Sequence, residues 1–106
     1  NKPYIDAVSI LGGEPLDQAK GLYDILSQVK SVTNKPIYLW SGYAYEEILV
    51  DKDKYSVIKD CVDILIDGEF KEELKNLKLQ LKGSSNQRVI DVKQSVNKGR
   101  VILWEN

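Results

Sequence analysis

Residues 12–15, Gly-Gly-Glu-Pro, have the composition of a turn that could hold a small charged ligand. They follow an apolar segment, residues 4–11, that is typical of a strand. Gly12 and Gly13 allow positive φ and a close approach of a ligand to the main chain, and the following proline suits the first turn of a helix. Glu14 therefore places a carboxylate at a strand-to-helix turn, where it could bind an ammonium group. The alternative is a polar residue at a helix start, favoured by the helix dipole.

A second candidate carboxylate, Asp67, ends the apolar segment 62–66 and precedes another glycine. Burial at this position would require a polar partner. Asp67 could contact a ligand, or it could cap the following helix. Asp63 lies four residues earlier on the same predicted strand, so its side chain would point to the same face and could share that partner.

The residue types that are absent exclude several kinds of chemistry. The 106 residues contain no histidine, which excludes a histidine base or an imidazole metal ligand in this chain. The single cysteine, Cys61, cannot form an internal disulfide, and the sequence suggests no metal site; we expect a buried thiol and a cytoplasmic location. No apolar run approaches the roughly 18 residues of a membrane span, so we expect no membrane association. No methionine is present either, and we interpret the chain as a fragment of a longer protein.

Predicted strands and helices alternate along the chain, which we treat as a single domain, residues 1–106. The predicted strands are 4–11, 36–42 and 62–68, and the predicted helices are 15–32, 45–50, 55–60 and 70–79. Such alternation indicates mostly parallel strands joined by helical crossovers, hence an α/β fold. The segments 89–92 and 100–104 predict a C-terminal β-hairpin with its turn near residues 97–99.

The predicted strands bring the candidate residues to one place. Ligands bind at the carboxyl ends of parallel strands in α/β folds, and each of the three predicted strands ends in a turn containing glycine. We therefore expect Glu14, Ser41 with Tyr43, and Asp67 to line one rim.

The polar string at residues 82–88 is the remaining candidate. It offers hydrogen-bond donors and acceptors without an apolar anchor, so it is either a solvent loop or a surface that faces a ligand or partner. Residues 71–106 carry an excess of basic side chains, but they lack the interleaved aromatic residues of a nucleic-acid groove, and we expect no nucleic-acid partner. The candidate partner-binding residues are Ser84, Ser85, Asn86, Gln87 and Arg88.

Four motifs in this order resemble one family. They are Gly-Gly-Glu-Pro after a strand, Trp-Ser-Gly-Tyr at 40–43, the segment 62–68 with Phe70, and Gly-Ser-Ser-Asn-Gln-Arg at 83–88. The chain resembles the C-terminal two-thirds of an anaerobic ribonucleoside-triphosphate reductase activating protein, a radical S-adenosylmethionine (SAM) enzyme. The glycine-glutamate turn marks the superfamily, whereas the 83–88 motif is more specific to this family.

The resemblance implies a fold, a cofactor and a partner. The fold would be a truncated partial βα barrel with SAM lying across the rim. Gly12, Gly13 and Glu14 would meet the amino group of SAM, and Asp67 would contact the rest of it. The family cleaves SAM reductively to methionine and a 5′-deoxyadenosyl radical, which takes a hydrogen from a glycine of the partner, anaerobic ribonucleoside-triphosphate reductase. The glycine is left as a glycyl radical.

One departure from the family is decisive. The family binds a 4Fe-4S cluster through Cys-x3-Cys-x2-Cys, which is missing here, and a single cysteine cannot replace it. We therefore expect the cluster only in the full-length parent, and this fragment to be inactive, with no catalytic residue of its own. Loss of a first barrel strand would expose a sheet edge at residues 4–11, where a dimer could form.

Two other interpretations stay open. The chain could be a non-catalytic α/β binding module for SAM, a nucleotide or a partner protein. Alternatively, Gly12 and Gly13 could cradle a phosphate, although the fuller glycine motif is missing and Glu14 would repel the phosphate.

Overall fold

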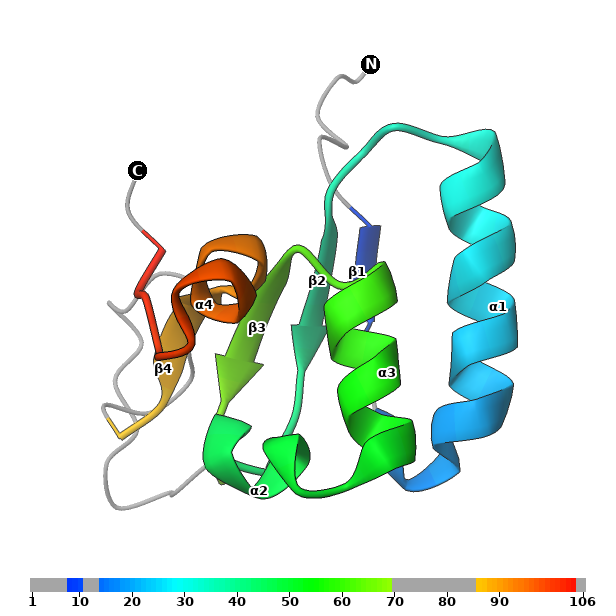
Figure 1. Cartoon of the computed structure of the whole chain (residues 1–106). Helices are drawn as coiled ribbons and strands as arrows, with labels where there is room; N and C mark the ends of the chain where they lie inside the picture. Colours follow the sequence, from blue (N-terminus) through cyan, green and yellow to red (C-terminus); the bar gives the residue numbers. More distant parts are fainter. Residues whose placement is uncertain (1–7, 11–13, 70–85, 105–106) are drawn as a thin grey trace.

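A computed structural model of the chain describes residues 8–10, 14–69 and 86–104 (Figure 1). The elements in chain order are β1 (Val8–Ile10), a 3-10 helix (Pro15–Gln18), α1 (Ala19–Val32), β2 (Ile37–Trp40), α2 (Tyr45–Leu49), α3 (Lys52–Cys61), β3 (Ile64–Asp67), β4 (Arg88–Asp91) and α4 (Val92–Lys98). The predicted helix 70–79 lies outside the described residues.

The strands form a mixed sheet in the order β1-β2-β3-β4. β1 pairs with β2 in parallel, and β2 pairs with β3 in parallel, with Leu39 opposite Leu65. β4 then pairs antiparallel to β3, with Ile90 opposite Leu65. The α/β class predicted from the sequence is confirmed, and the three predicted strands are present with shorter bounds.

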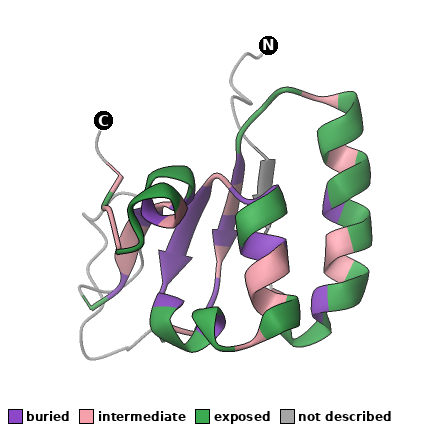
Figure 2. Ribbon diagram, viewed as in Figure 1, coloured by how far each residue is buried: buried purple, intermediate pink, exposed green. Residues whose placement is uncertain are grey.

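Helices α1 and α3 cover one face of this sheet, and their buried side chains complete the core (Figures 1 and 2). Leu26 of α1 and Ile58 of α3 are fully buried there. The core cluster draws on both helices and on the sheet: Leu16, Ala19, Leu26, Ile37, Leu39, Tyr45, Ile48, Val57, Ile58, Cys61, Val62, Leu65, Ile90 and Val92. The connections that carry the rim residues Glu14, Ser41 and Tyr43 therefore lie between elements that pack into one core.

Capping residues explain where the helices begin. The Asp51 side chain accepts a hydrogen bond from the backbone N–H of Lys54, at 3.1 Å, so α3 starts at Lys52, earlier than the predicted residue 55. The predicted first helix begins instead as a 3-10 turn with Pro15 at its start and Glu14 as its cap. None of the helices in the described ranges is long and apolar enough to cross a membrane.

The predicted C-terminal hairpin is wrong, because a helix stands where the turn was expected. Asp91 caps α4 through the backbone N–H of Gln94, at 3.0 Å, and Gly99 ends it with φ of 71°. An isolated antiparallel bridge still joins Ile90 to Leu103. The segments 89–92 and 100–104 therefore meet as predicted, but helix α4 connects them in place of a hairpin turn. Asp91 and Gly99, which the hairpin prediction places in a strand and in the turn, cap this helix.

Candidate functional site at the carboxyl ends of the parallel strands

Glu14 lies at the rim and is held there by three donors. Its Oε2 accepts hydrogen bonds from the backbone N–H of Leu16, at 3.1 Å, and from Ser41 Oγ, at 2.9 Å. Its Oε1 accepts one from the backbone N–H of Gly42, at 2.7 Å. All three donors are uncharged, and no ion pair with another described residue neutralises Glu14. The carboxylate therefore joins the start of the first helix to the end of β2 without an ion-pair partner among the described residues.

The end of β2 supplies the remaining contacts of this corner. Ser41 is buried, its backbone N–H donates to Ile66 O at 3.0 Å, and its Oγ also accepts from the backbone N–H of Tyr43 at 3.1 Å. A Cβ on Gly42 would lie 3.3 Å from Glu14 Oε1, so this position suits glycine. The predicted grouping of Glu14, Ser41 and Tyr43 is confirmed.

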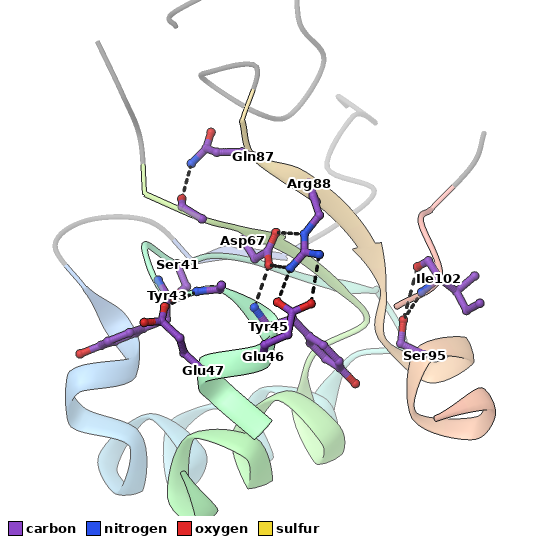
Figure 3. Close-up of polar contacts among 12 residues, drawn as sticks. Ser41, Tyr43, Tyr45, Glu46, Glu47, Asp67, Gln87, Arg88, Ser95 and Ile102 are labelled. Carbon is purple, nitrogen blue, oxygen red and sulfur yellow. Dashed lines mark hydrogen bonds and ion pairs between the residues drawn. The ribbon is translucent and has the colours of Figure 1, made fainter. Parts of the chain in front are cut away.

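Asp67 ends β3 beneath the same rim and is 1% exposed (Figure 3). Its Oδ2 accepts a hydrogen bond from the backbone N–H of Tyr45, at 2.7 Å, at the start of α2. Arg88 of β4 donates from Nε to Oδ1, at 3.1 Å, and from Nη2 to Oδ2. Asp67 is thus buried against a half-buried counter-charge, and Glu14 has no counter-charge among the described residues.

Arg88 also reaches Glu46 of α2, a residue that the sequence analysis did not select. Its Nη2 lies 2.7 Å from Glu46 Oε1 and its Nη1 lies 3.2 Å from Glu46 Oε2, a bidentate geometry (Figure 3). The guanidinium lowers the pKa of Glu46, and Asp67 followed by Glu46 raises the pKa of Arg88. In the sequence, Glu46 is an acidic residue in the first turn of a predicted helix, and Arg88 lies 42 positions away. Neither feature indicates that the two side chains form an ion pair.

The polar string at 82–88 turns its described side chains towards the end of β3. Asn86 Nδ2 donates to Glu69 O at 2.8 Å, and Gln87, which is 7% exposed, donates from Nε2 to Gly68 O at 2.9 Å. With Arg88 on Asp67, these contacts fix the start of β4 at the rim. Ser84 and Ser85 lie outside the described residues.

Two other predicted features had different outcomes. Gly12 and Gly13 lie outside the described residues. Among the described residues, Asp63 and Asp67 share no hydrogen-bond or ion-pair partner. Asp63 instead accepts from the backbone N–H of Ile37 at 2.8 Å and lies near lysine side chains of α1 and α4, at 4.0 and 3.5 Å. Its position before β3, at the amino ends of the parallel strands, explains the difference.

The residues of this chain do not fit an iron–sulfur cluster. Cys61 is the single cysteine of the sequence, it is buried at the end of α3, and burial raises the pKa of its thiol. Within the described ranges, no group of three or more histidine, cysteine, aspartate or glutamate side chains could hold a metal ion. A 4Fe-4S cluster requires several thiolates.

The sequence of the chain matches a known family of proteins. The family model for a 4Fe-4S single cluster domain matches residues 1–90, and the chain belongs to that family. An anaerobic ribonucleoside-triphosphate reductase-activating protein from Enterobacteria phage T4 is 35% identical over 92 residues, which is 84% of this chain and 55% of the phage protein. The protein of the same name from Escherichia coli strain K12 is 34% identical over 86 residues, 77% of this chain and 53% of its own length.

These relatives confirm the resemblance drawn from the motifs. A third protein of that name, from Vibrio cholerae, is 31% identical over 83 residues, 76% of this chain and 52% of its own length. The chain therefore spans about half the length of the curated relatives it matches, less than the two-thirds expected from the motifs. No solved structure matches the chain.

Proposed function

We propose that these residues form the C-terminal part of a radical SAM activating enzyme that generates a glycyl radical on anaerobic ribonucleoside-triphosphate reductase. The observation that carries the proposal is Glu14, a carboxylate without a counter-charge among the described residues, at the carboxyl ends of the parallel strands of the mixed sheet. The similarity to reductase-activating proteins of phage and bacteria supports it. In the proposal, the sheet is part of a partial βα barrel and the protein is cytoplasmic.

Glu14 fits the role of an ammonium acceptor. Its Oε1 accepts a single hydrogen bond from the described residues, and a carboxylate oxygen has room for a further donor. Its side chain is held from three directions, so little freedom would be lost when a ligand binds. In the proposal, Glu14 and the backbone of Gly12 and Gly13 bind the amino group of SAM, which supplies the radical chemistry when bound.

Asp67 and the polar string have neighbouring roles in the proposal. Asp67 binds Arg88 and the backbone N–H at the start of α2. In the proposal, Asp67 also contacts the part of SAM beyond its amino group. The partner reductase would be received by Ser84, Ser85, Asn86, Gln87 and Arg88. Of these, Asn86 and Arg88 each have a side chain that reaches the surface.

The cluster does not belong to these residues in the proposal. Because the single thiol is buried and the family model describes a 4Fe-4S domain, we expect the cluster ligands to lie elsewhere in the parent protein. We expect the 106 residues alone to be inactive. We also expect the edge of β1 to permit pairing with a second copy.

The test measures SAM affinity by calorimetry in the natural polypeptide that carries these residues. Glu14→Gln should weaken binding at least tenfold, since a charge-assisted hydrogen bond is lost. Asp24→Asn is the matched control, because Asp24 is exposed on α1 and its substitution also removes one negative charge. Gly42→Ala should have an intermediate effect, because its Cβ would displace Glu14 Oε1.

Unchanged affinity in Glu14→Gln would contradict the assigned role, provided that circular dichroism shows the same fold. A reductase-activation assay with the same variants then separates the enzyme from the alternative function. The absence of a fitting cluster ligand set favours that alternative, a non-catalytic module that binds SAM, a nucleotide or a partner. SAM binding without activation or iron in the parent protein would support it.

A further inference from the structure

A second hollow lies away from Glu14, between α2, α3 and the segment that follows α4. Its volume is about 420 Å³, within the range of small-molecule sites. The lining combines aromatic and aliphatic side chains with two arginines, Arg88 and Arg100. The aromatic and aliphatic members are Tyr45, Leu49, Tyr55, Val96 and Val101. Exposed apolar surface of this kind is stabilised by an occupant.

Tyr45 contributes a tyrosine side chain to the lining of this hollow. The residue is 3% exposed, and its ring extends from α2 towards α4 (Figure 3). Its backbone N–H is bound by Asp67, but its hydroxyl has no hydrogen-bond partner among the described residues. Burial raises the pKa of this phenol, so it stays a neutral donor and acceptor at physiological pH. No fully buried side-chain oxygen or nitrogen of the described residues lacks a partner, so the Tyr45 hydroxyl is in contact with solvent and is free to bind a ligand.

The charges around the hollow favour an anion. The acidic side chain in the lining, Glu46, is already paired with Arg88, and Arg88 is also paired with Asp67. Arg100 is exposed and makes no ion pair with any other residue in the described ranges. Its guanidinium is therefore available to a carboxylate, for which its planar geometry is suited.

We propose that this hollow binds a small apolar carboxylate, with the apolar body between Tyr45, Leu49 and Val96 and the carboxylate on Arg100. The Tyr45 hydroxyl donates a second hydrogen bond to the ligand. Two sources share this chemistry, a free aromatic or branched acid and the C-terminal residue of a peptide. Glu14 does not line the hollow, so the proposal does not require SAM to bind at Glu14.

Nuclear magnetic resonance titration of the natural polypeptide tests the proposal. Phenylacetate and the peptide Gly-Gly-Phe serve as the two anionic probes, and phenethylamine serves as the cationic control with a similar body. We expect saturable shifts of the backbone amides of Leu49, Val96 and Val101 with one or both anions. Binding of both phenylacetate and Gly-Gly-Phe would show that the hollow accepts an apolar carboxylate of either kind. Binding of the peptide alone would identify the ligand as the C-terminal residue of a peptide.

Three variants locate the contacts. Arg100→Gln should raise the dissociation constant about tenfold, and Tyr45→Phe about threefold, because it removes the hydroxyl and keeps the ring. Lys98→Gln is the matched control. Lys98 is exposed at the end of α4, two residues before Arg100, and it does not line the hollow. It should leave the constant within about twofold.

The proposal is overturned if neither anion shifts these amides at millimolar concentration. It is also overturned if phenethylamine binds as tightly as phenylacetate, or if Arg100→Gln and Lys98→Gln have equal effects. The readout needs neither iron nor SAM, so these results are independent of the SAM-affinity test.

Discussion

Glu14 and Asp67 occupy the same rim, but uncharged donors surround Glu14 whereas a guanidinium binds Asp67. Glu14 is half-buried and held by two backbone N–H groups and a serine hydroxyl. Asp67 is almost completely buried and held by the guanidinium of Arg88 and one backbone N–H. Asp67 therefore has a counter-charge within the fold, whereas Glu14 has none among the described residues.

The difference teaches that position at a rim does not by itself define a ligand contact. Removing a partner from a buried ion pair leaves an uncompensated charge, which is costly. Removing a neutral donor from a half-buried carboxylate costs about as much as a single hydrogen bond. We therefore expect Asp67 to contribute mainly to stability and Glu14 mainly to binding, and three substitutions can break or sharpen this contrast.

The largest effect is expected for Arg88→Met, which keeps the apolar stem and leaves Asp67 buried without its counter-charge. The free energy of unfolding should fall by about 3 kcal/mol, as measured by denaturant titration. Adding Asp67→Asn to this variant should restore part of the loss, because the buried charge is removed. A loss no larger than that of Glu46→Gln would show that Asp67 does not depend on Arg88.

Ser41→Ala should have a smaller effect, because it removes one neutral donor to Glu14 and the acceptor of the Tyr43 N–H. We expect a loss of about 1–2 kcal/mol in the free energy of unfolding. Ser56→Ala is the control, since the Ser56 hydroxyl binds the carbonyl of Lys52 within one helix. A loss equal to that of Arg88→Met would remove the distinction between the two corners.

The smallest effect is expected for Glu46→Gln, which weakens the exposed half of the Arg88 network. Because folding lowers the pKa of Glu46, its ionised form stabilises the protein above the ordinary glutamate pKa of 4.5. This contribution, about 0.5 kcal/mol for an exposed pair, should disappear as the pH falls through the lowered pKa. Unfolding free energies of both proteins at pH 7 and at pH 3 measure it; a difference that grows on acidification would contradict the assignment.

Local patterns in the sequence predicted much of the sheet and the grouping of Glu14 with Ser41. Apolar segments that end in glycine identify strands, and the parallel crossovers place their ends together. Helix α4 was not predicted, because Asn-Lys-Gly at 97–99 is compatible with a hairpin turn and with the end of a helix. The predicted hairpin places Asp91 in the strand 89–92, whereas in the structure its side chain caps α4.

The Arg88 network could not be predicted from spacing. Arg88 lies 21 residues from Asp67 and 42 from Glu46, and the three residues belong to β4, β3 and α2. An antiparallel fourth strand is needed to place Arg88 opposite Asp67. The sequence therefore indicated that Asp67 needs a polar partner, but tertiary structure alone identifies which residue it is.

The order of the strands has a consequence for how the chain folds during synthesis. Each strand of β1-β2-β3-β4 pairs with its immediate predecessor along the chain. A strand leaving the ribosome can therefore add to the edge of the sheet already formed, without opening an earlier pair. Arg88 belongs to β4, the last of these four strands along the chain, so its ion pair with Asp67 can form only once residue 88 has been synthesised.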